Sequence, residues 1–394
     1  MQKICIIGDG LSGLTTANIL AKQNIKIDFY CSPTISSKTL KDLRTTAISE
    51  TNYKYLIDKL EVNKNIFFPI KEVKLFYEDN NKIFNFLNLD EKEKKLMMIY
   101  KNEELKNFLN KKLLKNKNIK VIKKKITSIN YQKSSIETKA KSCEYDLIIL
   151  CIGSRSKLYD KITENRDIEK NYKEFSVTTT IHHKSQVISA AQYFLKEGPL
   201  AILPIQKNIF SVVWSVDSEF FRKNSKNLRL ILQNKIKKIL QNIKIIKINN
   251  ISSFPIFLNL KTKYFKKNVL IIGDGLHAIH PIAGQGFNLI LRDIRKLESL
   301  LLKNNNLGIS LKNTYILKDF YNSRKPENTM LSLGINLTNL FFKDTKHISP
   351  IRNLVLQNVK NVRYEIDMKK IMSPGGTTVG LANGILLADN KKIY

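Results

Sequence analysis

Asp274 stands directly after a short apolar run, Val269 to Ile272, which Gly273 brings to an end. A run of that length closed by a glycine is typical of a buried parallel strand rather than a helix. Open α/β sheets bind ligands at the carboxyl ends of their strands. A carboxylate at that edge disfavours a phosphate by its charge, but it accepts hydrogen bonds from sugar hydroxyls. The pattern therefore predicts that Asp274 binds a ligand through such hydroxyls.

A glycine-rich turn follows this aspartate. Pro281 comes first, then Gly284, Gln285 and Gly286, and from Phe287 onward apolar residues repeat at helical spacing. The turn is therefore expected to open a helix. The free backbone amides of that helix start, and the positive end of its dipole, suit a negatively charged or carbonyl-rich ligand.

The N-terminus contains a second glycine-rich turn in a strand–turn–helix–strand context. A strand at Ile4 to Ile7 leads into the sequence GDGLSG, and another strand is expected at Ile25 to Tyr30. In such a unit Gly8 permits the tight turn, Gly10 lets the backbone approach a pyrophosphate, and Gly13 allows close packing of helix on strand. The unit predicts a dinucleotide-binding site.

The region around Asp274 resembles the second flavin-binding motif of the aromatic-hydroxylase flavoproteins. The matching residues are Gly273-Asp274, His277, His280-Pro281, Ala283-Gly284-Gln285-Gly286 and Asn288. Within that class the region is similar to the ubiquinone-biosynthesis hydroxylases, which act on 2-polyprenylphenols. The resemblance implies that Asp274 holds the ribityl chain or nearby phosphate oxygens of FAD. It also implies that Pro281 and the Gly284 to Gly286 turn lie against the isoalloxazine ring.

Residues 42 to 49, DLRTTAIS, resemble a further block of the same family. Arg44 in this block is expected to reach a phosphate in a bidentate manner; the competing interpretation is an exposed surface arginine. Together the motifs predict the following cofactor-binding residues: Gly8, Gly10, Leu11, Ser12, Gly13, Arg44, Gly153, Gly273, Asp274, Pro281, Gly284, Gln285, Gly286, Phe287 and Asn288.

Two departures from the family pattern bear on the cofactors. Cys31 occupies the position at which an acidic residue usually binds the adenosine ribose, and Asp28 comes three residues too early. Strand alternation would point Asp28 elsewhere, so ribose recognition is expected to be weaker or to be supplied by Ser32 or the backbone. In a third motif the family aspartate and arginine are replaced by Ile152 and Tyr159, whereas Gly153 and Ser156 are kept. This motif is associated with flavin and with reduced nicotinamide, and its loss weighs more against direct NAD(P)H use than against FAD.

A metal site is not predicted. Asp274, His277 and His280 have a ligand-like spacing, but no fourth ligand is suggested and the flavin already explains the turn. His182 and His183 would point to opposite faces of a strand and could not chelate together.

The expected fold is α/β, with a Rossmann-like parallel sheet of the aromatic-hydroxylase type, an inserted β-sheet substrate domain and a helical C-terminus. A discontinuous FAD domain is expected at 1–66, 97–172 and 250–303, a substrate domain at 67–96 and 173–249, and a helical region at 304–394. Local patterns predict helices at 53–60 and 99–116, and antiparallel strands at 200–205 and 210–216. Trp214 is expected to pack in the sheet.

Composition limits the remaining partners. The 394 residues include 67 Lys and Arg against 34 Asp and Glu, a net charge of +33. Because the lysines form no single block and no nucleic-acid motif accompanies them, we favour a codon bias over nucleic-acid binding, with a membrane surface as the alternative. The four cysteines lack paired spacing, no signal peptide is expected, and no apolar run reaches membrane-spanning length. A cytoplasmic protein is predicted. The tail, 366–388, either docks on the flavin domain or contacts the inner membrane surface peripherally.

The resemblance implies an FAD-dependent monooxygenase in which a flavin C4a-hydroperoxide, formed with O2, hydroxylates a polyprenylated phenol in ubiquinone biosynthesis. Electrons would come from NAD(P)H or a separate reductase, and a ubiquinone-biosynthesis complex is a candidate partner. The flavin carries the chemistry, so no catalytic acid–base residue is named. Two alternatives remain: an FAD-dependent lipid or prenyl reductase of the same fold, and a catalytically impaired scaffold.

Overall fold

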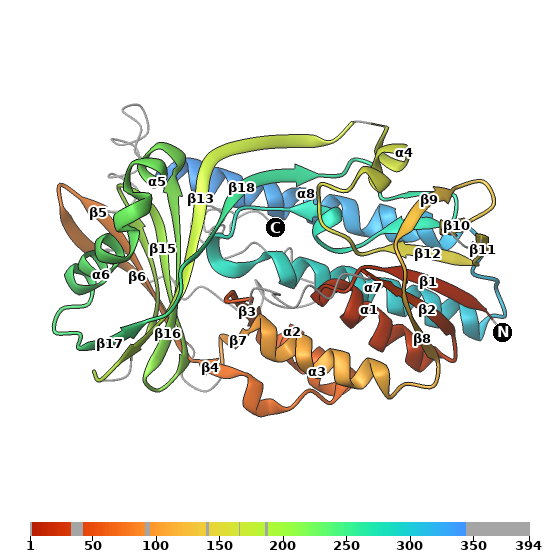
Figure 1. The fold of residues 1–394 in the computed structure, drawn as a ribbon, viewed down its shortest axis with the longest axis horizontal. Helices are drawn as coiled ribbons and strands as arrows, with labels where there is room; N and C mark the ends of the chain where they lie inside the picture. The colour runs from red at the N-terminus through yellow and green to blue at the C-terminus, as the bar shows by residue number, and fades with distance from the viewer. Residues whose placement is uncertain are drawn as a thin grey trace, which may run out of the picture.

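A computed structural model describes most of the chain, with two sheets arranged end to end and joined by long strands and helices (Figure 1). The described residues are 2–32, 42–90, 95–138, 142–164, 166–185 and 188–343. The tail at 366–388, for which the sequence left two interpretations, lies outside them.

The first sheet has six strands in the order β19-β20-β12-β1-β2-β8, parallel except for β19. Its central strands are uninterrupted apolar runs such as the LIIL of β12, all buried, as expected for a parallel sheet covered on both faces. The strands are β1 (Lys3–Ile7), β2 (Lys26–Cys31), β8 (Ile119–Lys123), β12 (Leu147–Leu150), β19 (Phe265–Lys266) and β20 (Val269–Ile271).

Helices and a small sheet cover this parallel sheet. Helix α1 is buried along nearly its whole length and contacts both α3 and α7. A sheet of β9, β10 and β11 adds Ile129 and Ile136 to the same core; the sequence had not predicted β10 and β11. The elements are α1 (Leu11–Leu20), α2 (Glu50–Leu60), α3 (Asn102–Leu114), β9 (Ile126–Asn130), β10 (Ser135–Thr138), β11 (Ser142–Glu144) and α4 (Asp160–Thr163).

The second sheet has nine strands, in the order β21-β18-β13-β16-β15-β14-β5-β6 with β17 paired to β13. Trp214 is fully buried on its outer face with residues of α6, which confirms its expected packing role. The elements are β5 (Glu72–Asp79), β6 (Lys82–Asp90), β13 (Ile168–His183), β14 (Ala190–Leu195), β15 (Gly198–Gln206), β16 (Ile209–Asp217), α5 (Ser218–Asn224), α6 (Leu228–Ile239), β17 (Ile245–Ile248), β18 (Ser252–Leu260) and β21 (His277–Ala278).

A three-stranded sheet in the order β3-β7-β4 lies between the two larger sheets. Its strands are β3 (Thr45–Ser49), β4 (Phe68–Ile70) and β7 (Met97–Lys101). The expected helix at 99–116 is therefore wrong at its start, because residues 97–101 pair with both β3 and β4 and the helix begins only at Asn102.

The long strand β13 crosses the expected domain boundary at 172/173 and pairs with β18 over most of its length. Residues 252–260, expected in the FAD domain, are thus a strand of the nine-stranded sheet. The boundary expected at 249/250 therefore leaves this strand out of the substrate domain. Antiparallel pairing with β13 places the strand in the nine-stranded sheet. The division into domains is otherwise still a proposal.

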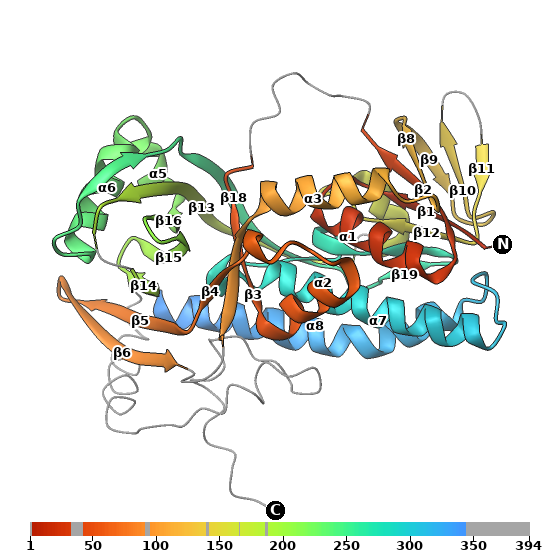
Figure 2. The same ribbon diagram turned by 90° about the horizontal axis from the view of Figure 1, so that it is seen from below.

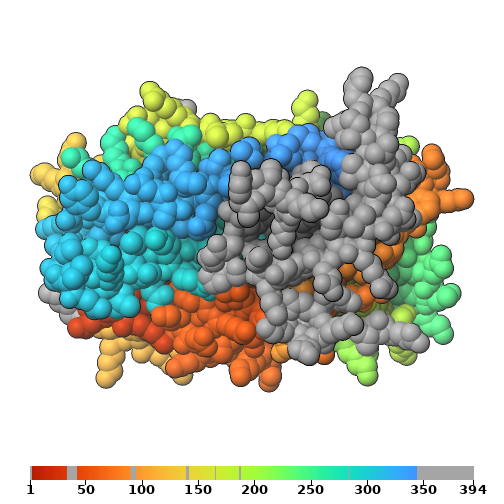
Figure 3. All heavy atoms as spheres, turned by 180° about the vertical axis from the view of Figure 1, so that it is seen from behind, coloured from red at the N-terminus to blue at the C-terminus, as the bar shows by residue number. Residues whose placement is uncertain are grey.

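Two long helices complete the molecule, α7 (Gly286–Asn306) and α8 (Tyr315–Phe342). They lie side by side, and α8 extends from the parallel sheet to the nine-stranded sheet (Figure 2). Both form one continuous band on a face of the molecule (Figure 3). No helix among the described residues is both long enough and apolar enough to cross a membrane.

Candidate functional site

The N-terminal turn is shaped by two glycines that no other residue could replace without strain. Gly8 has a φ of +122°, and a Cβ there would lie 2.2 Å from the carbonyl oxygen of Cys151. A Cβ on Gly13 would lie 2.0 Å from the carbonyl oxygen of Gly8. By contrast, nothing lies within 4 Å of a Cβ built on Gly10. The turn is thus packed against backbone atoms at Gly8 and Gly13, whereas space is open beside Gly10, directly before α1.

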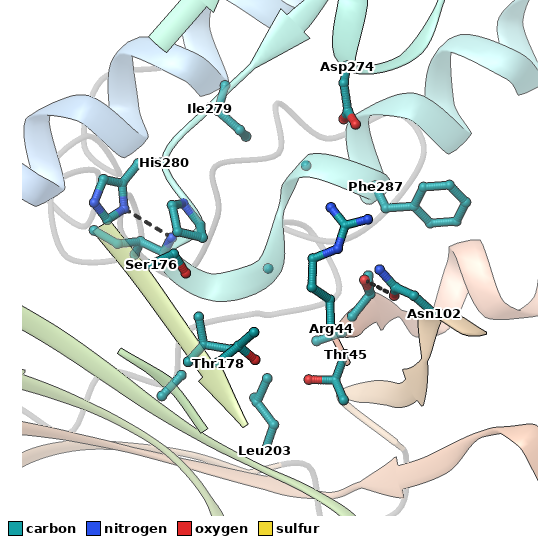
Figure 4. A pocket seen from close by; sticks show the side chains of 18 of the residues that line it. Arg44, Thr45, Asn102, Ser176, Thr178, Leu203, Asp274, Ile279, His280 and Phe287 are labelled. Atoms are coloured by element: carbon teal, nitrogen blue, oxygen red, sulfur yellow. Dashed lines mark hydrogen bonds between the residues drawn. The ribbon is translucent and has the colours of Figure 1, made fainter. Parts of the chain in front are cut away.

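That opening leads into a cavity of about 580 Å³ between the parallel sheet and the nine-stranded sheet (Figure 4). Of the predicted cofactor-binding residues, those that line this cavity are Gly8, Gly10, Leu11, Ser12, Arg44, Gly153, Asp274, Pro281, Gly284, Gly286 and Phe287. They come from separate parts of the sequence and meet at the carboxyl ends of β1, β12 and β20, the edge at which such sheets bind ligands.

Gly13, Gly273, Gln285 and Asn288 do not line the cavity. Gly273 has a φ of +93°, and its Cβ would lie 2.8 Å from the Ser12 side chain. Asn288 accepts hydrogen bonds from the backbone N–H of Ser49 and from Asn52, and it donates to the carbonyl of Ala47. Asn288 therefore fixes the start of α7 against β3 and α2, a positioning role that the motif alone did not reveal.

Asp274 lines the cavity, and its side chain is exposed to it. The protein around the carboxyl still raises its pKa by desolvation, and the charges of Arg44 and His277 act in the opposite direction. Figure 4 shows the Arg44 guanidinium pointing toward Asp274 across the cavity.

Arg44 holds Asp42 with two parallel hydrogen bonds, Nε to Oδ1 at 2.8 Å and Nη2 to Oδ2 at 2.7 Å. Burial raises the pKa of Asp42, but these hydrogen bonds outweigh it and lower the pKa below its ordinary value. About half of the Arg44 side chain is exposed, and both residues line the cavity. Asp42 thus fixes the Arg44 guanidinium at the cofactor end of the cavity and pairs its charge.

Asp28 points away from this edge, as strand alternation predicted. It accepts a hydrogen bond from the Tyr145 hydroxyl at 2.7 Å and forms an ion pair with Lys3 at 2.8 Å. Cys31 ends β2, and its Sγ lies 3.8 Å from the carbonyl oxygen of Ile122.

Tyr159, at the position of the family arginine, packs beneath the loop that carries Asp274. Its hydroxyl donates to the carbonyl of Ile152 at 2.5 Å, and a Cβ on Gly275 would lie 2.0 Å from that hydroxyl. Burial raises the pKa of Tyr159 well above its ordinary value, so the phenol stays protonated. The departure from the motif therefore has a structural consequence: a buried phenol joins the end of β12 to the Gly273–Gly275 loop.

A second hollow of about 650 Å³ adjoins the first and shares Arg44, Gly153 and Asp274 with it. It is lined by residues of β18 and by Arg155, whose guanidinium carbon lies 4.4 Å from the centre of the Phe257 ring.

The two histidines of the Asp274 segment bind separate carboxylates. His277 Nε2 lies 2.6 Å from Asp293 of α7, which also accepts a hydrogen bond from Arg324 of α8 at 2.7 Å. His280 Nε2 donates to Glu174 of β13 at 2.9 Å. No group of three or more His, Cys, Asp or Glu among the residues described could hold a metal ion. Sequence reasoning missed Glu174 and Asp293, because the first lies 106 positions from His280 and the second 16 positions from His277, on another element.

The residues present fit FAD. The open turn at Gly10 leads to the amino end of α1, and the cavity continues past Asp274 to the turn that opens α7. The architecture, a parallel dinucleotide-binding sheet joined to a large mixed sheet, is that of the FAD-dependent aromatic monooxygenases.

Solved structures share this fold. A probable FAD-dependent monooxygenase, PqsL from Pseudomonas aeruginosa, superposes with a TM-score of 0.72 at 15% identity, covering 89% of this chain and 99% of that one. The p-nitrophenol 4-monooxygenase PnpA from Pseudomonas putida gives 0.73 at 15% identity, covering 94% and 97%. At such low identity the likeness establishes the fold alone, and it confirms the predicted fold class.

Comparison of sequences establishes the family. The FAD binding domain family matches residues 90–306, more than half of the chain, and the protein belongs to that family. FAD is therefore its cofactor, as predicted.

Curated relatives refine the likeness. Ubiquinone biosynthesis monooxygenase COQ6 of Dictyostelium discoideum is 28% identical over 204 residues, 43% of this chain and 41% of that protein. Ubiquinone hydroxylase UbiL of Rhodospirillum rubrum is 28% identical over 191 residues, 47% and 44%. The 3-demethoxyubiquinol 3-hydroxylase of Escherichia coli is 29% identical over 166 residues, 42% of each. The matched segments thus span less than half the length of these relatives. The predicted resemblance to ubiquinone-biosynthesis hydroxylases is confirmed.

Proposed function

We propose that this protein is an FAD-dependent monooxygenase that hydroxylates the aromatic ring of a polyprenylated phenol in ubiquinone biosynthesis. The names of the sequence relatives support this reaction. The observation that carries the proposal is the single cavity, which runs from the Gly8–Gly10 turn to a largely apolar floor on the nine-stranded sheet. A dinucleotide end and an apolar end in one space suit a flavin and a lipid-like ring.

The chain would divide the binding of FAD among several segments. The turn from Gly8 to Gly13 would take the pyrophosphate, Arg44 would neutralise a phosphate, and Asp274 would accept hydrogen bonds from the ribityl chain. Pro281 and the Gly284–Gly286 turn would lie against the flavin ring. Bound FAD supplies the oxygen chemistry.

The remaining walls would bind the substrate and exclude water. Strands β5, β14 and β15 contribute apolar side chains, and Phe194 of β14 stacks on Phe342 of α8 with ring centres 3.6 Å apart. Such walls favour a prenylated ring over a small charged acid, because burial of apolar surface drives binding there. Exclusion of water also protects reactive groups in the closed site.

The electron donor is either NAD(P)H or a separate reductase. Arg155 lines the second hollow and is a cation suited to a donor phosphate, whereas Ile152 and Tyr159 replace the family residues associated with nicotinamide. Anaerobic addition of NADPH to the FAD-loaded protein decides between the two donors. Bleaching of the flavin bands supports direct use, and persistent bands point to a reductase.

A peripheral contact with a lipid surface is part of this proposal. Helix α8 exposes an apolar stripe on its outer side (Met330, Leu333, Leu337 and Leu340), while Thr338 and Phe342 of the same helix line the cavity. An apolar stripe of this kind can enter the interfacial region of a bilayer. Flotation with anionic vesicles should recover the wild-type protein and lose the Leu333→Ser/Leu337→Ser variant. The alternative is that a protein partner in a ubiquinone-biosynthesis complex covers these apolar side chains.

Product mass tests the reaction itself. Incubation of the reduced, FAD-loaded protein with a prenylphenol and dioxygen should give a product heavier by one oxygen atom. A product heavier by hydrogen would favour a prenyl reductase, and the absence of turnover by a fully loaded protein would favour a scaffold.

A further inference from the structure

Strand β13 presents two hydroxyl side chains to the floor of the cavity. Because strand side chains alternate between faces, Ser176 and Thr178 share the cavity face, and both line the cavity (Figure 4). Val177 and Thr179 belong to the opposite face: Val177 packs in the core beneath α5 and α6. The Thr179 hydroxyl donates to the carbonyls of Asn249 and Asn250.

Neither cavity hydroxyl has a hydrogen-bond partner in the part of the chain that the structure describes. Both residues are almost completely buried, with exposed fractions of 0% for Ser176 and 1% for Thr178. A buried hydroxyl without a partner is costly, and native proteins satisfy nearly all such groups. The two hydroxyls therefore indicate that something which enters the cavity bonds them.

Apart from Gln192, the floor becomes apolar away from β13. The cross-strand neighbours of Thr178 in this sheet are, in order, Val213 of β16, Ala201 of β15 and Gln192 of β14. Two positions further along the strands, Leu203 of β15 and Ala190 of β14 also line the cavity. The stacked Phe194 and Phe342 form the far wall. Because β14 lies three strands from β13, this wall is roughly 14 Å from the hydroxyl pair. One end of the cavity suits an oxygen and the other a hydrocarbon.

The hydroxyl pair has a fixed position relative to the turn expected to carry the flavin ring. Glu174 lies two residues before Ser176 on the same face of β13 and accepts the hydrogen bond of His280 at 2.9 Å. His280 directly precedes Pro281, and Figure 4 shows Ser176 beside this turn. A group held by the pair would therefore lie at a defined distance from the turn.

We propose that Ser176 and Thr178 bind the ring oxygen of the phenolic substrate and thereby orient the ring, with the prenyl chain directed across the sheet toward Phe194 and Phe342. This inference rests on the proposed function, since it names the atoms that would recognise the phenol. A serine and a threonine hydroxyl can each donate and accept, so the pair suits a phenol or its anion. The role is binding and orientation, with no proton transfer assigned.

Binding of a matched pair of ligands tests the proposal without turnover. The ligands are a short-chain prenylphenol and the corresponding prenylbenzene, which lacks the oxygen, titrated into the FAD-loaded protein with flavin fluorescence as the signal. A pocket built to hydrogen-bond an oxygen rejects the analogue without it, so the wild type should bind the phenol about tenfold or more tightly. The Ser176→Ala/Thr178→Val double variant should lose this preference for the phenol over prenylbenzene. Its affinity for prenylbenzene should equal that of the wild type.

Thr179→Val is the matched control, because it makes the same change one residue away on the opposite face of β13. It should keep the wild-type preference for the phenol. If the wild type binds both ligands equally, or the double variant retains the preference, the proposal is wrong even though the protein binds prenylated rings. If the wild type binds neither ligand, the proposed function itself is contradicted. A melting curve with FAD bound establishes that each variant is folded.

Discussion

Glu174 of β13 accepts a hydrogen bond from His280 Nε2 at 2.9 Å, and so ties the floor of the cavity to the turn that opens α7. The backbone N–H of Ile282 donates to His280 Nδ1 at 3.3 Å, so both ring nitrogens have partners. Lys343, directly after α8, donates to the other oxygen of Glu174 at 3.1 Å. One buried carboxylate thus joins three elements that surround the site.

Removal of this carboxylate should cost stability. Burial raises the pKa of Glu174, but hydrogen bonds from His280 and Lys343 outweigh it and lower the pKa below its ordinary value. Glu174→Ala leaves the buried His280 without its acceptor, so we expect a loss of about 1–3 kcal/mol in the free energy of unfolding. Chemical denaturation measures it. Glu219→Ala, which removes only an exposed ion pair with Lys223, should change stability far less.

Asp293 should make the protein sensitive to acid. Burial raises the pKa of Asp293, but Arg324 and His277 outweigh it, and the pKa lies below its ordinary value. A folded-state pKa below the unfolded value means that the stabilisation is present at neutral pH and is lost as the pH falls below about 4.

Asp293→Asn should therefore lose about 3 kcal/mol at neutral pH, because it leaves the Arg324 charge buried and less well compensated. The difference in unfolding free energy between wild type and variant, measured by denaturation from pH 7 to pH 3, should shrink toward low pH. A difference that stays constant with pH would contradict the assignment.

Asp274→Ala should lose tightly bound FAD, because it removes the carboxylate expected to bind the ribityl chain. The ratio of flavin to protein absorbance after gel filtration measures the loss. Asp319→Ala, an exposed position on α8, is the control and should retain its flavin. An Asp274→Ala protein that retains a full complement of FAD would exclude the role given to Asp274.

Gly275 and Tyr159 should behave as a coupled pair. Gly275→Ala places a Cβ 2.0 Å from the Tyr159 hydroxyl, so the buried ring must move, at a cost of about 1–3 kcal/mol. Tyr159→Ala removes the ring that the new Cβ would meet. Gly275→Ala should therefore reduce the free energy of unfolding less in the Tyr159→Ala background than in the wild type. Denaturation of both single variants and the double variant gives the coupling energy. Additive costs would show that the contact is absent.

The sequence predicted what local patterns and motifs determine. The apolar runs at 4–7 and 269–272 lie in the parallel sheet, and most residues of the two glycine-rich turns meet at one cavity. It did not reveal contacts between distant segments, such as His280 with Glu174, 106 positions apart. Residues 99–101 were predicted as the start of the helix at 99–116, because a short apolar run before a helix carries no periodicity of its own. Pairing with β3 and β4 decides their conformation.

The most direct test of the central claim uses isotopically labelled dioxygen. The FAD-loaded protein is reduced anaerobically by light with EDTA as the electron donor, without a reductase or a nicotinamide, and is then mixed with a short-chain prenylphenol and exposed to the labelled gas. We predict a product that carries one labelled oxygen atom on the ring, formed in proportion to the flavin reduced. A fully FAD-loaded protein that binds the prenylphenol but reoxidises without placing labelled oxygen in it would contradict the assignment as a hydroxylase.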